Sequence, residues 1–79
     1  MEIQVRLYGT LGNDLSGHDP LKGMVVEIPE GSNIGDLIGR LAIPRKKVGI
    51  ISVDGNLVKN STLLQPGDFV RMYRPIFGG

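Results

Sequence analysis

The residues whose types and spacing best suggest a chemical role are the last five of the chain, Pro75-Ile76-Phe77-Gly78-Gly79. Glycine has no Cβ, so the two terminal glycines reach backbone conformations that other residues avoid. Five extended residues span about 17 Å at about 3.3–3.6 Å each, and the proline stiffens the base of the segment. Such a tail can enter a narrow active site of a partner while the domain stays outside. The alternative is a frayed end without a role.

Other side chains offer weaker candidates. His18 and Asp19 are adjacent in a polar segment, but one His beside one Asp does not make a metal site, and a solvated loop is favoured. No Ser-His-Asp arrangement or phosphate-binding glycine loop occurs. The chain has no cysteine, which excludes disulfides, thiolate metal sites and thiol nucleophiles. We therefore expect a non-enzyme that acts with partners and binds no cofactor or metal of its own.

Length and charge narrow the class of protein further. A chain of 79 residues makes one domain. A net charge of +1 gives no electrostatic case for nucleic acid or an anionic membrane as partner. No apolar run approaches the roughly 20 residues of a membrane span, and the charged, alternating N-terminus is not a signal peptide. We expect a cytoplasmic protein.

Alternating apolar residues predict most of the strands. In residues 2–8, Ile3, Val5 and Leu7 share one face, and Gln4, Arg6 and Tyr8 share the other. The Gly-, Asp- and Pro-containing segment 9–22 predicts a long loop. Asp54-Gly55 is a strong hairpin signal. Further strands are predicted at 23–28, 48–55, 56–59 and 68–74.

One helix is predicted over residues 33–42, with Ser32 as its N-cap and Pro44 ending it. Ile34, Leu37, Ile38 and Leu41 have the spacing of a single apolar stripe. Gly35 and Gly39 lower helix propensity by about 1 kcal/mol each, so packing must stabilise the helix, and the two glycines are expected to let it approach the sheet closely.

The predicted element order gives an α+β fold. One helix covers the apolar face of a mixed four- to five-stranded sheet, in a two-layer arrangement. The first and last strands have the best-marked apolar faces, which predicts that they lie side by side in the centre. The expected division is a domain over 1–74 and a tail over 75–79.

Four segments together resemble the ubiquitin-like β-grasp proteins of the MoaD/ThiS group of sulfur carriers. They are IQVRLYG, IPEGSNIGDLIGRL, ISVDGNLV and LQPGDFVRMYRPIFGG, and the resemblance covers the whole chain. The last segment, which runs through a P-G-D turn to a strand, Pro and Gly-Gly, is the most specific. The long loop 9–22 is more similar to the MoaD branch, the small subunit of molybdopterin synthase.

The resemblance implies that the reactive group is the α-carboxylate of Gly79, reached through Gly78. A ubiquitin-activating-type enzyme would adenylate this carboxylate with ATP, and a sulfur donor would convert it to a thiocarboxylate. The acceptor would be the large subunit of molybdopterin synthase or an equivalent enzyme, in molybdenum or tungsten cofactor biosynthesis. The alternatives are a thiamin-type carrier, a modifier joined to lysines through Gly79, and a non-covalent module with an idle tail.

The strand pattern also predicts a docking surface on the sheet face away from the helix. Ile50 joins that face if Ile51 and Val53 point inward, and Arg6 flanks it. Exposed apolar residues with Tyr and Arg among them are typical of protein interfaces, although single exposed aromatic residues are ordinary. The expected partner-binding residues are Tyr8, Ile50, Phe69, Arg71, Tyr73 and Arg74, followed by Pro75, Ile76 and Phe77 in the tail.

Overall fold

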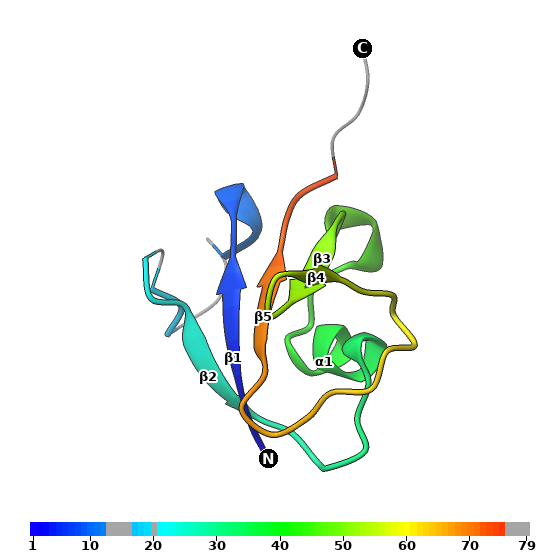
Figure 1. Ribbon diagram of the computed structural model, residues 1–79. Helices are drawn as coiled ribbons and strands as arrows, with labels where there is room; N and C mark the ends of the chain where they lie inside the picture. Colours follow the sequence, from blue (N-terminus) through cyan, green and yellow to red (C-terminus); the bar gives the residue numbers. More distant parts are fainter. Residues whose placement is uncertain (13–16, 20, 76–79) are drawn as a thin grey trace.

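The structure is a computed structural model that describes residues 1–12, 17–19 and 21–75, and all statements below concern these residues. One α-helix packs against a five-stranded sheet, with two short 3-10 helices in the connections (Figure 1). In chain order the elements are β1 (Glu2–Leu7), η1 (Gly9–Gly12), β2 (Met24–Glu27), α1 (Ile34–Arg40), η2 (Arg45–Lys47), β3 (Ile51–Val53), β4 (Asn56–Leu57) and β5 (Phe69–Met72).

The sheet has the order β2-β1-β5-β3-β4, so the first and last strands lie in its centre. β1 and β5 run parallel, with Gln4 opposite Phe69 and Leu7 opposite Met72. The other three pairs are antiparallel, which makes the sheet mixed. The predicted α+β class, the two-layer arrangement and the central position of both strands are confirmed.

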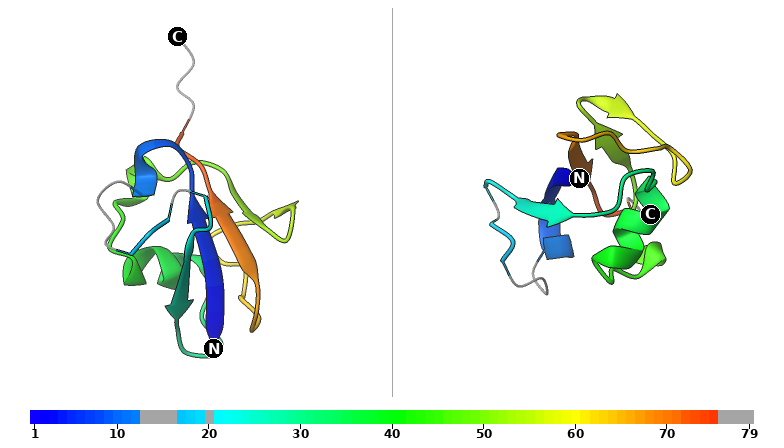
Figure 2. Two further views of the ribbon diagram at one scale, coloured as in Figure 1. Left: turned by 90° about the vertical axis from the view of Figure 1, so that its left-hand side faces the viewer. Right: turned by 90° about the horizontal axis from the view of Figure 1, so that it is seen from below.

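The core lies between the sheet and α1, which covers one face only (Figure 2). The apolar alternation of the two central strands faces this core, since their inward residues are almost completely buried. Full burial of each such side chain contributes about 1.5–3 kcal/mol, so these rows hold the two layers together. The residues are Ile3, Val5, Leu7, Val70 and Met72 from the sheet, and Ile34, Leu37 and Ile38 from the helix.

The predicted hairpin at Asp54-Gly55 is present. Both residues have positive φ, 50° and 88°, which is the conformation of a two-residue type I′ turn. The turn sets the register, with Val53 opposite Asn56 and Ser52 opposite Leu57. β3 is shorter than the predicted 48–55, since it covers only Ile51–Val53 and the last two predicted residues form the turn.

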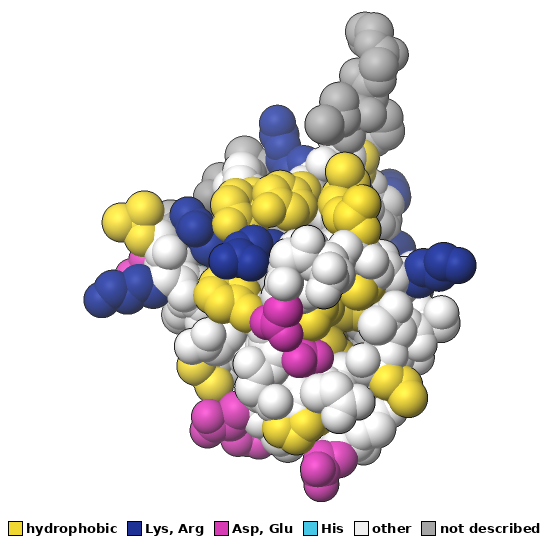
Figure 3. Space-filling view, in the orientation of Figure 1, with side chains coloured by type: hydrophobic (Ala, Val, Ile, Leu, Met, Phe, Trp, Pro, Cys, Tyr) yellow, Lys and Arg dark blue, Asp and Glu magenta, His cyan; other side chains and the backbone are white. Residues whose placement is uncertain are grey.

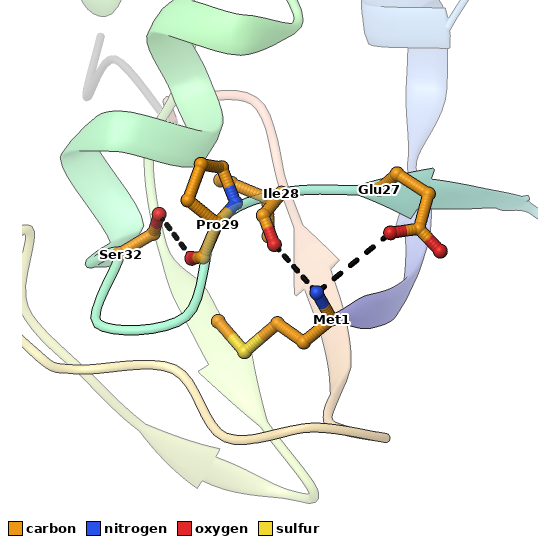
Figure 4. A network of polar contacts seen from close by, with 5 residues as sticks. All are labelled: Met1, Glu27, Ile28, Pro29 and Ser32. Carbon is orange, nitrogen blue, oxygen red and sulfur yellow. Dashed lines mark hydrogen bonds and ion pairs between the residues drawn. The ribbon is translucent and has the colours of Figure 1, made fainter.

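The helix begins one residue later than predicted. Asn33 is the N-cap: its Oδ1 accepts from the Asp36 amide at 2.8 Å, and the Asp36 carboxylate accepts from the Asn33 amide at 2.9 Å. This reciprocal pair is a capping box. The prediction of Ser32 as the cap is wrong, because its hydroxyl donates instead to the carbonyl of Pro29 at 2.6 Å (Figure 4).

The same region ties the start of β1 to the end of β2. The amino group of Met1 donates to the carbonyl of Ile28 at 2.8 Å and lies 3.7 Å from the Glu27 carboxylate (Figure 4). These contacts fix the antiparallel β1–β2 pair at the N-terminal end of β1.

The helix ends before Pro44. Its last residue is Arg40, and Ala42 turns the chain with a φ of 57°. Gly39 is exposed, and a Cβ added there would meet nothing within 4 Å, so the expected role of this glycine in close packing is wrong. No helix in the described part of the chain is long and apolar enough to cross a membrane.

The cap gives a first prediction. Asn33→Ala is expected to lower the free energy of unfolding by about 1 kcal/mol, because it removes the side-chain acceptor of the capping box. Urea unfolding followed by circular dichroism measures this loss. The matched control is Asn33→Ser, which keeps a cap oxygen and should stay close to the original stability. An equal loss in both variants would contradict the assigned cap.

Candidate functional site

The sheet face opposite α1, here called the open face, carries the predicted docking residues. Alternate positions of the two central strands point to it, with Arg6 directly opposite Arg71. Hydrophobic side chains gather on this face close to the start of the tail, with cationic side chains beside them and acidic ones mainly lower down (Figure 3). The sequence-based assignment of Tyr8, Phe69, Arg71 and Tyr73 to one face agrees with this register.

Ring contacts order these side chains. Tyr8 and Tyr73 stack with centroids 4.4 Å apart and planes at 16°. The guanidinium of Arg6 lies 4.6 Å from the Tyr8 centroid, and that of Arg71 lies 4.3 Å from the Phe69 centroid. Such contacts contribute about 0.5–1.5 kcal/mol each. They place the side chains before a partner arrives, which lowers the entropy cost of binding.

Beside the tyrosine stack, the open face has a hollow of about 490 Å³ between β5 and the β3–β4 hairpin. Ile51 is buried and Val53 is half-buried, so Ile50, which is 52% exposed, lies on the open side as predicted. Leu57, at 74% exposure, was not predicted, although the two-residue turn places it opposite Ser52. The hollow is lined by Ile50, Ser52, Gly55, Leu57, Arg71, Tyr73 and Arg74.

Residues 73–75, here called the root of the tail, are fixed by backbone contacts with residues 49 and 50. The backbone amide of Tyr73 donates to the Ile50 carbonyl at 2.9 Å, and the backbone carbonyl of Tyr73 accepts from the Gly49 amide at 2.7 Å. A Cβ at Gly49 would lie 2.7 Å from Pro75 Cα and 2.8 Å from the Arg74 carbonyl oxygen, so the backbone passes too closely for a side chain there. The chain is thus fixed in position up to Pro75.

The remaining tail residues, Ile76, Phe77, Gly78 and Gly79, lie outside the described residues. The roles predicted for them, and the boundary between 74 and 75, stay predictions. Arg74 itself is exposed, and its side chain lies beside Gly9 at the end of β1. The described part of the site therefore ends where the predicted tail begins.

Of the two residues expected in a solvated loop, Asp19 is exposed and His18 is not. His18 is half-buried, and its Nε2 accepts from the Leu7 amide at 3.0 Å. Asp19 is exposed and closes a turn: hydrogen bonds from the amides of Lys22 and Leu21 lower the pKa of its carboxyl, helped by the charges of His18 and Arg6. Among the described residues no cluster of three or more His, Cys, Asp or Glu side chains is placed to hold a metal ion.

Comparison with models of protein families shows which family the chain belongs to. The family model described as Mut7-C ubiquitin matches residues 1–78. The chain belongs to the Mut7-C ubiquitin family. The ubiquitin-like β-grasp fold expected from the sequence is therefore confirmed. A search of curated proteins finds no match.

Solved structures agree on the fold of this Mut7-C ubiquitin. A putative molybdopterin converting factor subunit 1 from Pyrococcus furiosus has a TM-score of 0.73 and 20% identity over 95% of this chain and 98% of that one. SAMP1 from Haloferax volcanii has a TM-score of 0.69 and 14% identity over 100% of both chains. A second structure of the Haloferax protein, small archaeal modifier protein 1, has a TM-score of 0.68 and 12% identity over 95% of this chain and 98% of that one.

The open face of this Mut7-C ubiquitin has the chemistry of a protein-binding surface. Two arginines from adjacent strands lie opposite one another, and like charges in that position repel. The arginines contribute cationic groups to this face, and the tyrosines, Ile50 and Leu57 contribute apolar area. The open face leads through Tyr73 to Pro75, where the predicted tail begins.

Proposed function

We propose that this chain is a sulfur carrier whose Gly79 carboxylate is adenylated and then converted to a thiocarboxylate. The observation that carries the proposal is the path of the chain from the open face into the tail. β5 leads through Tyr73 and Arg74 to Pro75, with no intervening loop, so a partner docked on the open face would receive the Gly-Gly end.

The chemistry requires a partner at each step. An adenylating enzyme uses ATP to join AMP to the Gly79 carboxylate, releasing pyrophosphate. A sulfide-level donor then attacks the acyl carbon, forming the C–S bond as AMP leaves. After the sulfur attacks the acceptor, water cleaves the acyl–sulfur bond and restores the carboxylate. The chain is a co-substrate throughout, binds no cofactor of its own and catalyses none of these steps.

The partners we propose are an adenylating enzyme of the ubiquitin-activating type and an acceptor synthase. The likeness to a putative molybdopterin converting factor subunit favours molybdopterin as the pathway, with the synthase large subunit as acceptor. A thiamin-type carrier would use the same activation. The arginines of the open face fit an acidic docking surface on either enzyme.

Conjugation to lysines of other proteins is the second candidate function. It is favoured by the likeness to a protein named small archaeal modifier protein 1. The acyl-adenylate is common to both fates, so the two functions differ only in whether sulfur or an amine attacks the activated carbon.

Intact mass of the mature protein tests the proposal. The intact mass of the natural protein is first measured to establish that it ends at Gly79. The protein is then incubated with the adenylating enzyme of its own host, ATP and sulfide. We expect a mass gain equal to the replacement of one oxygen by sulfur, lost when Gly79 is deleted. Conjugates through Gly79 without that gain would favour the modifier. A mature chain that continues past Gly79, or neither product with an active enzyme, would overturn both.

A further inference from the structure

The imidazole of His18 replaces a missing strand partner. β2 begins at Met24, opposite Val5, so the amide of Leu7 lies beyond the end of the β1–β2 ladder. Leu7 is buried, and an unpaired buried amide costs about 1–3 kcal/mol. The Nε2 atom of His18 accepts from this amide at 3.0 Å and supplies the bond that β2 does not make.

This hydrogen bond exists in one protonation state only. A neutral imidazole accepts through its bare nitrogen, whereas in the imidazolium both nitrogens donate. The bond from Leu7 therefore requires Nε2 without a proton and the proton on Nδ1. Protonation would turn the acceptor into a donor facing another donor, and the contact would break.

Backbone contacts hold the ring in that place. A Cβ at Gly12 would lie 2.4 Å from His18 Nδ1, so the ring sits directly against the main chain of η1. On its other side, Asp19 and Gly23 exchange two backbone hydrogen bonds of 3.1 and 2.7 Å. The ring thus links the bonded pair of Asp19 and Gly23 to both β1 and η1.

The charged groups around the ring come from β1 and from the turn itself. Arg6 precedes Leu7 on β1, and Lys22 lies in the turn. Asp19 interacts electrostatically with His18 and with Arg6. η1 has no ionisable side chain.

We propose that His18 is a pH-sensitive latch, closed when neutral, that holds the His18–Asp19 pair and Gly23 against β1 and supports the open face next to it. The link to the open face is short. Leu7 is followed by Tyr8, whose amide donates to the Met72 carbonyl at 3.0 Å and whose ring stacks on Tyr73. The latch does not depend on whether Gly79 carries sulfur. Imidazoles as a class change charge between about pH 5 and 8.

Amide exchange measured by NMR on the unmodified chain tests the latch. His18 is the single histidine, so its imidazole signals report its titration without overlap. Between about pH 8 and pH 5 we expect the protection factor of the Leu7 amide to fall at least about tenfold, with the midpoint of the imidazole titration. The ring signals of Tyr8 should shift with the same midpoint. The internal reference is the Gln4 amide, which donates to the Asp68 carbonyl at 2.9 Å and should keep its protection.

The matched variant is His18→Gln, whose amide oxygen takes the place of Nε2 but does not titrate. Its Leu7 protection should not change with pH. Unchanged Leu7 protection while the imidazole titrates would overturn the latch, as would the same pH dependence in His18→Gln. Loss of Gln4 protection together with that of Leu7 would show global unfolding and also overturn it. Tyr8 signals that stay constant would overturn its link to the open face.

Discussion

Gly23→Ala is expected to lower the free energy of unfolding by about 3 kcal/mol. Two causes act together. Gly23 has a φ of 79°, a conformation that costs other residues about 1–2 kcal/mol. In addition, a Cβ there would lie 2.2 Å from the carbonyl oxygen of Val5. That oxygen belongs to the backbone of β1 and cannot move without disturbing the ladder.

Gly31→Ala is the matched control for this variant. Gly31 has a nearly equal φ of 85°, but a Cβ added there meets nothing within 4 Å. This variant should therefore lose only the conformational part, about 1–2 kcal/mol. Urea unfolding of both variants gives the two free energies, and their difference isolates the contact with Val5. Equal losses would mean that β1 and the turn separate easily, against the packing described here.

The parts of the fold that the sequence predicts are those with a local physical cause. Alternation in β1 and β5 is clear because one face of each strand is buried and the other is not. The Asp54-Gly55 turn is predictable because few dipeptides accept two positive φ angles. Those two features, with one amphipathic helix between them, lead to the β-grasp arrangement.

The errors have partly non-local causes. Ser32 and Asn33 are both good cap residues, and the choice between them depends on tertiary contacts. The Ser32 carbonyl accepts from Leu64, and the Ile34 amide donates to Thr62, so the 62–64 segment fixes where the helix starts. The local signal for this start is the spacing of Asn33 and Asp36 in the capping box, which the prediction did not use.

The sequence likewise predicts only those residues of the candidate site whose positions have a local cause. The strand period places Tyr8, Phe69, Arg71 and Tyr73, because side-chain direction alternates whatever the partner strand. Leu57 could have been found from the register that the two-residue turn imposes. The bond between His18 and Leu7 could not, because a side chain binding a backbone amide across eleven residues leaves no periodic signal.

Tyr73→Ala is expected to weaken binding of the adenylating enzyme about 30-fold or more, which corresponds to about 2 kcal/mol. Tyr73 lies at the centre of the site, since it stacks on Tyr8, lines the hollow with Ile50 and begins the root of the tail. Tyrosines in such positions are typical binding hot spots because they bury a large area with few rotatable bonds. Isothermal titration calorimetry with the enzyme of the same host measures the dissociation constant.

Two further variants separate binding from folding. Tyr73 is half-buried, so its loss also weakens the fold, whereas Leu57 is 74% exposed and its replacement leaves the core intact. Leu57→Asp should still weaken binding, because it puts a carboxylate at the edge of the hollow, where an acidic partner would be repelled. Leu63→Ala is the control: Leu63 is 61% exposed but pairs with Asn33 at the start of α1, away from the open face.

These three variants give a pattern that a general loss of stability cannot produce. Binding should fall for Tyr73→Ala and Leu57→Asp and stay unchanged for Leu63→Ala, while urea unfolding shows loss of stability mainly for the first. If Leu57→Asp binds as tightly as the unmodified chain, the hollow is not part of the interface. If all three bind equally, the partner does not dock on the open face, and the Gly-Gly end must reach it from another surface of the domain.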